Sequence, residues 1–103
     1  MAPNDPRLHS DEFEEIPQGA KSKRGFHIVA NKYPWLEYFE PDREVSIFCE
    51  FMGRRKGLIV YARDMRARSV VNPEDRIRIL ANITGGLEFL GWEVEVTGLE
   101  SKL

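Results

Sequence analysis

The sequence predicts an α+β fold, in which a mostly antiparallel sheet of about four strands is packed by one long helix. Apolar and polar residues alternate in four segments, 25–31, 43–52, 58–62 and 92–97, as they do in strands with one buried face. Before the last of these segments, residues 73–90 carry apolar side chains three and four positions apart, which is the spacing of an amphipathic helix. The predicted order is therefore β-β-β-α-β.

The chain begins with a segment, residues 1–22, that predicts a flexible acidic tail, and residues 23–103 then form a single α+β domain. The first twenty residues contain five acidic side chains and one arginine, and they are rich in proline and polar residues. Phe13 and Ile16 are their main bulky apolar residues. Two such side chains offset little of the ordering entropy, which is about 1–2 kcal/mol per residue. We therefore expect at least residues 1–10 to be loose.

Residues 25–31 supply the first predicted strand, because every second side chain from Phe26 onward is apolar. The next ten residues, 32–41, are predicted to be an irregular connection. They contain Pro34 and Pro41, and proline within a segment argues against one regular strand.

The clearest strand covers residues 43–52. Residues 58–62, which contain β-branched and aromatic side chains, predict the next strand. Between them, two glycines flank three basic residues, so residues 53–57 predict a hairpin loop. Residues 63–71 either extend the second of these strands or leave the sheet.

A helix start is predicted at Asn72, whose side chain can accept a hydrogen bond from the first amides of the helix. Pro73 follows where no N–H donor is needed, and the next two residues are acidic and face the positive end of the helix dipole. Gly85 and Gly86 either permit a close approach to a strand or kink the helix. Gly91 suits a left-handed C-cap, so the last strand begins directly after it.

The composition excludes several classes of protein. A chain of 103 residues has room for one domain. No run approaches the roughly 18 apolar residues of a membrane span, and the first residues lack the apolar segment of a secretory signal. Cys49 is the single cysteine, so we expect no internal disulfide and a reducing, cytoplasmic location. No sequence motif indicates a metal ion or a cofactor.

The residues that often carry catalysis do not form a recognisable group, so the chain is interpreted as a protein without enzymatic activity. Cys49 lies among apolar strand residues, where a buried and inert thiol is expected. His27 and His9 have no nucleophile or base placed beside them in the sequence. Glu93 and Glu95 share one face of the last strand. Paired carboxylates can do acid–base chemistry, but on a terminal amphipathic strand they are expected to form the solvated face.

Charge is distributed unevenly along the chain, although the formal net charge is only −2. Residues 51–80 contain eight arginines and lysines against three acidic residues, and acidic segments flank them. One alternative function is therefore a small nucleic-acid-binding protein that uses the basic 54–68 stretch to contact phosphates. The simpler interpretation is a solvated surface, and the acidic balance of the whole chain favours it.

Four aromatic residues, Tyr33, Trp35, Tyr38 and Phe39, fall within seven positions of the predicted connection. They form either a lid over the core or a protein-binding patch, because aromatic side chains anchor interfaces with little loss of entropy. If they form a lid, a second alternative follows, namely a small ligand-binding protein or enzyme.

Several motifs occur together in the second half of the chain. The strand V-S-I-F-C-E-F-M at 45–52 has the form V-x-I-x-x-E followed by two apolar residues, and L-I-V-Y-A follows at 58–62. The helix at 74–83 fits the form E-x-R-x-x-I-x-x-N-I approximately, and a Leu-x-x-x-Gly segment at 87–91 then leads into V-E-V at 94–96. This half of the chain resembles a group of small bacterial immunity proteins from polymorphic toxin systems.

The resemblance implies an inhibitor that neutralises a cognate toxin by direct binding, without catalysis. Tight inhibition takes about 800 Å² of surface and a few aromatic or arginine anchors. If the toxin is a nuclease, Glu37 and Glu40 can mimic phosphate groups. The predicted partner-binding residues are Trp35, Glu37, Tyr38, Glu40, Arg54, Arg55 and Lys56.

Overall fold

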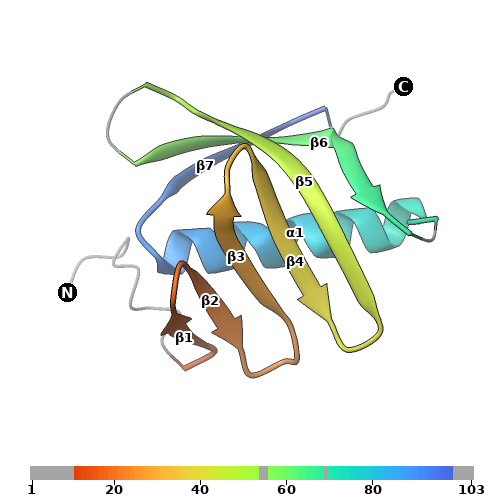
Figure 1. Cartoon of the computed structure of the whole chain (residues 1–103), viewed down its shortest axis with the longest axis horizontal. Coiled ribbons are helices and arrows are strands. Elements are labelled where there is room, and N and C mark those ends of the chain that lie inside the picture. Colours follow the sequence, from red (N-terminus) through yellow and green to blue (C-terminus); the bar gives the residue numbers. More distant parts are fainter. Residues whose placement is uncertain (1–10, 54–55, 69, 99–103) are drawn as a thin grey trace.

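The computed structural model describes residues 11–53, 56–68 and 70–98, and Figure 1 shows how they are arranged. Within this part of the chain, seven strands form one sheet against a single helix, so the prediction of about four strands in the order β-β-β-α-β is wrong. The strands are β1 (Phe13–Ile16), β2 (Gly19–Ser22), β3 (His27–Lys32), β4 (Trp35–Glu40), β5 (Arg43–Phe51), β6 (Gly57–Ala67) and β7 (Glu93–Thr97), and the helix is α1 (Pro73–Phe89).

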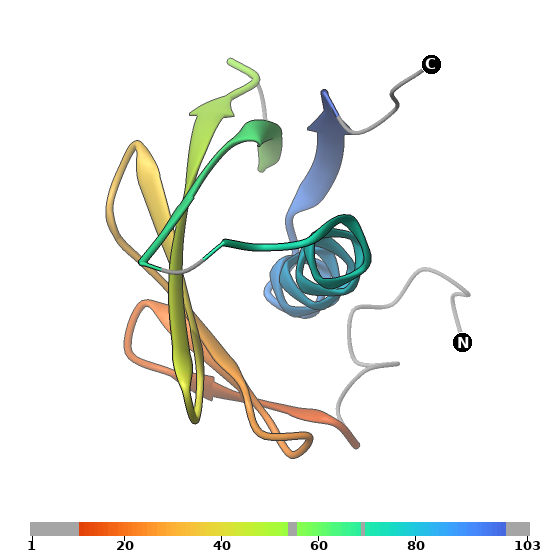
Figure 2. The ribbon, with the colours of Figure 1, turned by 90° about the vertical axis from the view of Figure 1, so that its right-hand side faces the viewer.

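The strands lie in the sheet in the same order as in the chain. Neighbours from β1 to β6 are antiparallel, whereas β7 runs parallel to β6 because α1 crosses over between them. The sheet curls around α1, which lies on its concave side (Figure 2). We call this concave side the inner face and the opposite, convex side the outer face.

The predicted flexible tail is a hairpin of the sheet over residues 13–22. Phe13, at the start of β1, is only 4% exposed. Its ring stacks on Phe89 of α1, with centroids 5.6 Å apart, and meets Phe26 edge-on at 5.9 Å. Backbone pairing with β3 and burial of this one large side chain supply the stabilisation that composition did not suggest. Residues 1–10 lie outside the described residues.

The predicted irregular connection contains the regular strand β4. Pro34 precedes β4 and Pro41 follows it, so neither proline removes an N–H group from the interior of the strand. β4 pairs with β3 on one side and β5 on the other. Its side chains consequently alternate: Leu36 and Tyr38 are buried on the inner face, and the residues between and beside them face outward.

The hairpin of β5 and β6 confirms the two central strands and answers the question that the sequence left open. β6 continues to Ala67, so most of residues 63–71 extend the strand. The register with β5 shifts between Ile47 and Cys49, which marks a bulge, and pairing then continues to Val45 and Ala67. Arg54 and Arg55, in the loop of this hairpin, lie outside the described residues.

The start of α1 confirms the predicted cap. The N–H of Asp75 donates to the side-chain oxygen of Asn72 over 2.8 Å. Within the helix, a Cβ atom placed on Gly86 would lie 2.6 Å from the Cδ1 atom of Ile28, so this glycine permits a close approach of α1 to β3. After the helix, Gly91 has a φ of +94°, as predicted for a left-handed turn.

The core lies between α1 and the inner face, and it includes Cys49, which is 2% exposed. Its exposure confirms the prediction of a buried cysteine. Burial also raises the pKa of the Cys49 thiol to about 11. In the part of the chain that the structure covers, no helix has both the length and the apolar character that crossing a membrane requires.

Candidate partner-binding face

The outer face of the sheet is the candidate site. Among the described elements, the one helix packs on the inner face and leaves the outer face of the central strands uncovered. The outward side chains of these strands are half-buried or exposed. These side chains are unusually large for a solvated sheet face. They include the aromatic residues Trp35 and Phe39 of β4, Phe48 of β5 and Tyr61 of β6.

Three of these residues form a continuous line across β4, β5 and β6, which we call the aromatic row: Trp35, Phe48 and Tyr61. The rings of Trp35 and Phe48 meet edge-to-face at 5.6 Å, and those of Phe48 and Tyr61 meet at 5.3 Å. Such contacts hold the rings in place before any partner arrives, so little side-chain entropy remains to be lost on binding.

Both ends of the aromatic row carry charge. At the β4 end, the guanidinium of Arg66 lies 4.3 Å from the centre of the Trp35 ring, which is a cation–π contact. At the other end, the Tyr61 hydroxyl donates a hydrogen bond to Glu50. This bond to the carboxylate raises the pKa of Tyr61, so its hydroxyl remains a donor. The negative charge at this end of the row is that of the Glu50 carboxylate.

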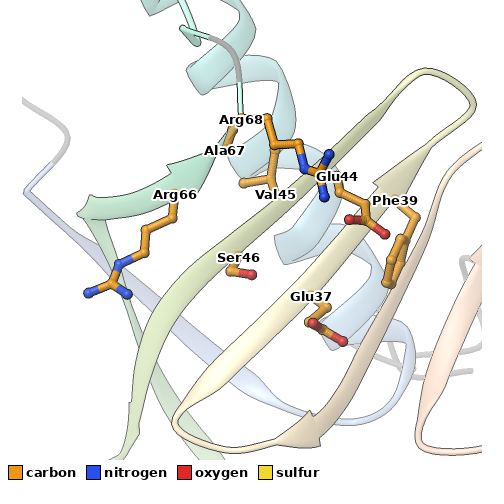
Figure 3. Close-up of a pocket in the computed structure, with 8 residues that line it drawn as sticks. All are labelled: Glu37, Phe39, Glu44, Val45, Ser46, Arg66, Ala67 and Arg68. Atoms are coloured by element: carbon orange, nitrogen blue, oxygen red, sulfur yellow. The ribbon is translucent and has the colours of Figure 1, made fainter.

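Beside the row, the outer face has a hollow of about 240 Å³, which is drawn in Figure 3. Ser46 of β5 is paired with Glu37 of β4 on one side and with Arg66 of β6 on the other, so three neighbouring strands present an acid, a serine and a base in one line. The short serine side chain leaves the space between the two longer ones unfilled. Glu44 of β5 and Arg68, which follows β6, also line the hollow and lie opposite each other.

Comparison with known proteins adds no constraint on this interpretation. No protein-family model, curated protein or solved structure matches the chain. The chemistry of the outer face therefore carries the functional argument: it offers rigid aromatic surface, charges of both signs, and a hollow beside the aromatic row.

Trp35 and Glu37 are the two predicted site residues that the structure places on the outer face. Glu37 is oriented by Lys32, whose Nζ atom lies 3.6 Å from the carboxylate. Their shared position follows from alternation, because residues two apart on a strand face the same way.

Tyr38 and Glu40, predicted to bind a partner, instead belong to the interior and its margin. Tyr38 is fully buried, and its hydroxyl accepts a hydrogen bond from the Nδ2 atom of Asn82 over 3.0 Å and donates one to Glu40. Burial and the bond to Glu40 raise the pKa of Tyr38 to about 12. Partial burial raises the pKa of Glu40, but the hydrogen bonds from Arg78 and Tyr38 outweigh it, and the pKa stays below its usual range. Tyr38 and Glu40 thus connect β4 to Asn82 and Arg78 of α1 and are not part of the outer face.

Of the three predicted basic anchors at the hairpin loop, the structure describes Lys56. Arg54 and Arg55 lie outside the described residues. Lys56 donates a hydrogen bond to the carbonyl of Leu90 over 2.8 Å, and its ammonium lies 5.3 Å from the centre of the Trp92 ring. It therefore places a positive charge at the C-terminal end of α1, where the helix dipole favours one.

Phe48 and Ser46 were missed by the sequence reasoning. Phe48 occupies a polar-face position of a strand that alternates cleanly, which is the signal that identifies it: an aromatic residue among outward-facing polar ones. Ser46 gives no such signal, because its importance comes from the longer side chains that stand beside it on the neighbouring strands.

The fold separates Cys49 from His27, while His9 lies outside the described residues. Cys49 lies on the inner face, whereas His27 lies on the outer face and stacks on Phe39 with ring centres 4.6 Å apart. Because the sheet separates them, the two do not form a nucleophile–base pair. The aromatic residues Tyr33 and Trp35 border an apolar pocket of about 70 Å³, which is well below the roughly 300 Å³ that small-molecule sites begin at.

Proposed function

We propose that this chain is a non-catalytic protein-binding module, an immunity-type inhibitor that neutralises a cognate toxin by holding it against the outer face of the sheet. The observation that carries the proposal is the aromatic row of Trp35, Phe48 and Tyr61, ordered by its own ring contacts and left uncovered by the described helix. Aromatic residues and arginine dominate the energetically important positions of protein interfaces.

The charges around the row suit a protein partner. Arg66 at one end and Glu50 at the other place charges of opposite sign at the two ends of the aromatic row. Complementary charges speed the encounter and fix the orientation of the partner, while the aromatic centre supplies the buried area. An inhibitor needs both properties and needs no catalytic group.

A cytoplasmic place of action is part of the proposal. The chain has one cysteine, Cys49, and its thiol is buried in the core. A fold that is held by packing and hydrogen bonds and carries a free thiol suits a reducing compartment.

The proposal is tested by affinity capture from the native host, followed by mass spectrometry. The wild-type chain should retain one protein in stoichiometric amount, and Phe48→Ala and Tyr61→Ala should each release it. Ile77→Ala is the matched control, because Ile77 is an apolar residue of α1 that is 56% exposed and far from the outer face in sequence and fold. Circular dichroism of each variant verifies that it is folded.

A functional readout completes the test. Expression of the captured protein should arrest growth, and co-expression of the wild-type chain, but not of Phe48→Ala, should restore it. Capture of nucleic acid alone, or equal retention of the protein by all variants, would contradict the proposal. Turnover of a small compound by the purified chain would contradict it as well.

A further inference from the structure

We infer that the hollow around Ser46 is a two-pole docking site that selects a protein segment carrying one acidic and one basic side chain, and that it rejects polyanions such as nucleic acids. This inference rests on the proposed function and adds the chemistry of the partner. It starts from the line of Glu37, Ser46 and Arg66 across three neighbouring strands.

The spacing of this line sets the size of the site. Strands two apart are separated by about 10 Å, so Glu37 of β4 and Arg66 of β6 stand far enough apart to avoid neutralising each other. Ser46 has the short side chain between them, which creates the hollow seen in Figure 3. A volume of about 240 Å³ suits one or two side chains of a partner.

The positive pole is ready to accept a carboxylate. Arg66 is held over the ring of Trp35, and Arg68 lies two residues further along the same edge of the hollow. Among the described residues, neither arginine has a carboxylate within ion-pair distance, whereas Arg24, Arg43 and Arg78 each have one. Fixing the guanidinium by stacking lowers the entropy cost of a charge-assisted hydrogen bond to a partner.

The negative pole decides between classes of partner. Glu37 and Glu44 line the side of the hollow formed by β4 and β5, and Lys32 contacts only the first of them. A nucleic acid bound by Arg66 and Arg68 would bring further phosphates against these carboxylates. A protein segment avoids this repulsion, because it can present a lysine or arginine to Glu44 and a carboxylate to Arg66.

The decisive variant exchanges the poles without changing the net charge. Glu37→Arg combined with Arg66→Glu should raise the Kd for the captured protein at least about thirtyfold, as expected when a buried charge pair is broken. The matched control exchanges Glu14 and Lys21, an exposed cross-strand pair of β1 and β2, and should leave the Kd unchanged. Ser46→Leu fills the hollow, retains every charge and should weaken binding similarly.

A titration with simple probes tests the site without the partner. Amide shifts of the ¹⁵N-labelled chain should change at Ser46 and Arg66 on addition of a blocked hexapeptide that alternates Glu and Lys. A tetraglutamate peptide and a single-stranded DNA 12-mer should change them less. Equal or tighter binding of either polyanion at these amides overturns the inference, as does binding of the captured protein that survives both Ser46→Leu and the pole exchange. If the captured protein still binds both variants, the inference fails but the proposed function stands. If no protein is captured, the proposed function fails, and the peptide titration alone tests the inference.

Discussion

The two adjacent glycines of α1 provide a quantitative test of how closely the helix packs on the sheet. At Gly85, an added Cβ would lie 3.6 Å from the nearest atom of Phe13, which is ordinary contact. At Gly86, it would lie 2.6 Å from Cδ1 and 3.3 Å from Cγ1 of Ile28, which is 1% exposed and therefore has little room to move. One substitution, Gly→Ala, thus meets two different environments in neighbouring positions.

The expected magnitudes follow from opposing effects. Replacing glycine by alanine in a helix interior gains about 1 kcal/mol, and Gly85→Ala should show that gain. Overpacking a core costs about 1–3 kcal/mol, so Gly86→Ala should be neutral to about 2 kcal/mol less stable than the wild type. The two variants should therefore differ by roughly 1–3 kcal/mol in their free energy of unfolding, which urea denaturation followed by circular dichroism resolves.

A third substitution identifies the atom responsible. Ile28→Val removes the Cδ1 atom nearest to the added Cβ, at a cost of about 0.5–1.5 kcal/mol by itself. In that background, Gly86→Ala should become as favourable as Gly85→Ala, which makes the two changes non-additive. Additive effects, or equal stabilities of the two alanine variants in the presence of Ile28, would refute the close approach of α1 to β3.

Three other predictions concern the interior. Tyr38→Phe should lower the free energy of unfolding by about 1–3 kcal/mol, measured in urea, because Asn82 loses a buried acceptor; an unchanged midpoint would argue against this bond. The hydrogen bonds from Arg78 and Tyr38 lower the pKa of Glu40 on folding. The ionised carboxylate therefore stabilises the folded chain above its ordinary pKa near 4.5, and this contribution is lost as the pH falls through the lower pKa of the folded state. Glu40→Gln should therefore reduce the loss of stability between pH 7 and pH 3, seen as urea midpoints that move closer together. Finally, with a pKa of about 11, Cys49 should react with a thiol reagent at pH 8 some two-hundredfold more slowly in the native chain than in urea, and similar rates would contradict its burial.

Local signals in the sequence predicted the elements that are set by nearby residues. The N-cap at Asn72 and the left-handed Gly91 depend on one or two side chains and one backbone conformation, so the sequence alone identifies them. The β5–β6 hairpin depends on alternation within a single short stretch, which is equally visible.

The β1–β2 hairpin could not be predicted in this way because its stability comes from distant residues. Phe13 is buried by Phe89, which lies 76 positions later, and Gly19 is required because a Cβ there would lie 1.9 Å from the carbonyl oxygen of Ile28. Neither partner is apparent from the composition of an acidic, proline-containing segment. The strands that were missed therefore form where tertiary contacts outweigh local propensity.

The candidate site illustrates the same distinction on β4. The sequence grouped Trp35, Glu37, Tyr38 and Glu40 as one patch because they are close in the chain, and it treated their segment as irregular. Once the segment is a strand, alternation assigns Tyr38 to the core and leaves Trp35 and Glu37 on the outer face. Proximity in sequence then ceases to define the site, and proximity across strands replaces it.

The consequence for function is that the outer face owes its character to positions on different strands that are weak signals individually. Phe48 completes a row that begins at Trp35, and Ser46 opens a hollow only because Glu37 and Arg66 stand beside it. A substitution such as Ser46→Leu is chemically mild and leaves every charge in place, yet it removes the space into which a partner would fit. If the outer face binds by complementary shape and charge, this one change should impair binding as much as the loss of an aromatic ring does, even though every charged group of the face is kept.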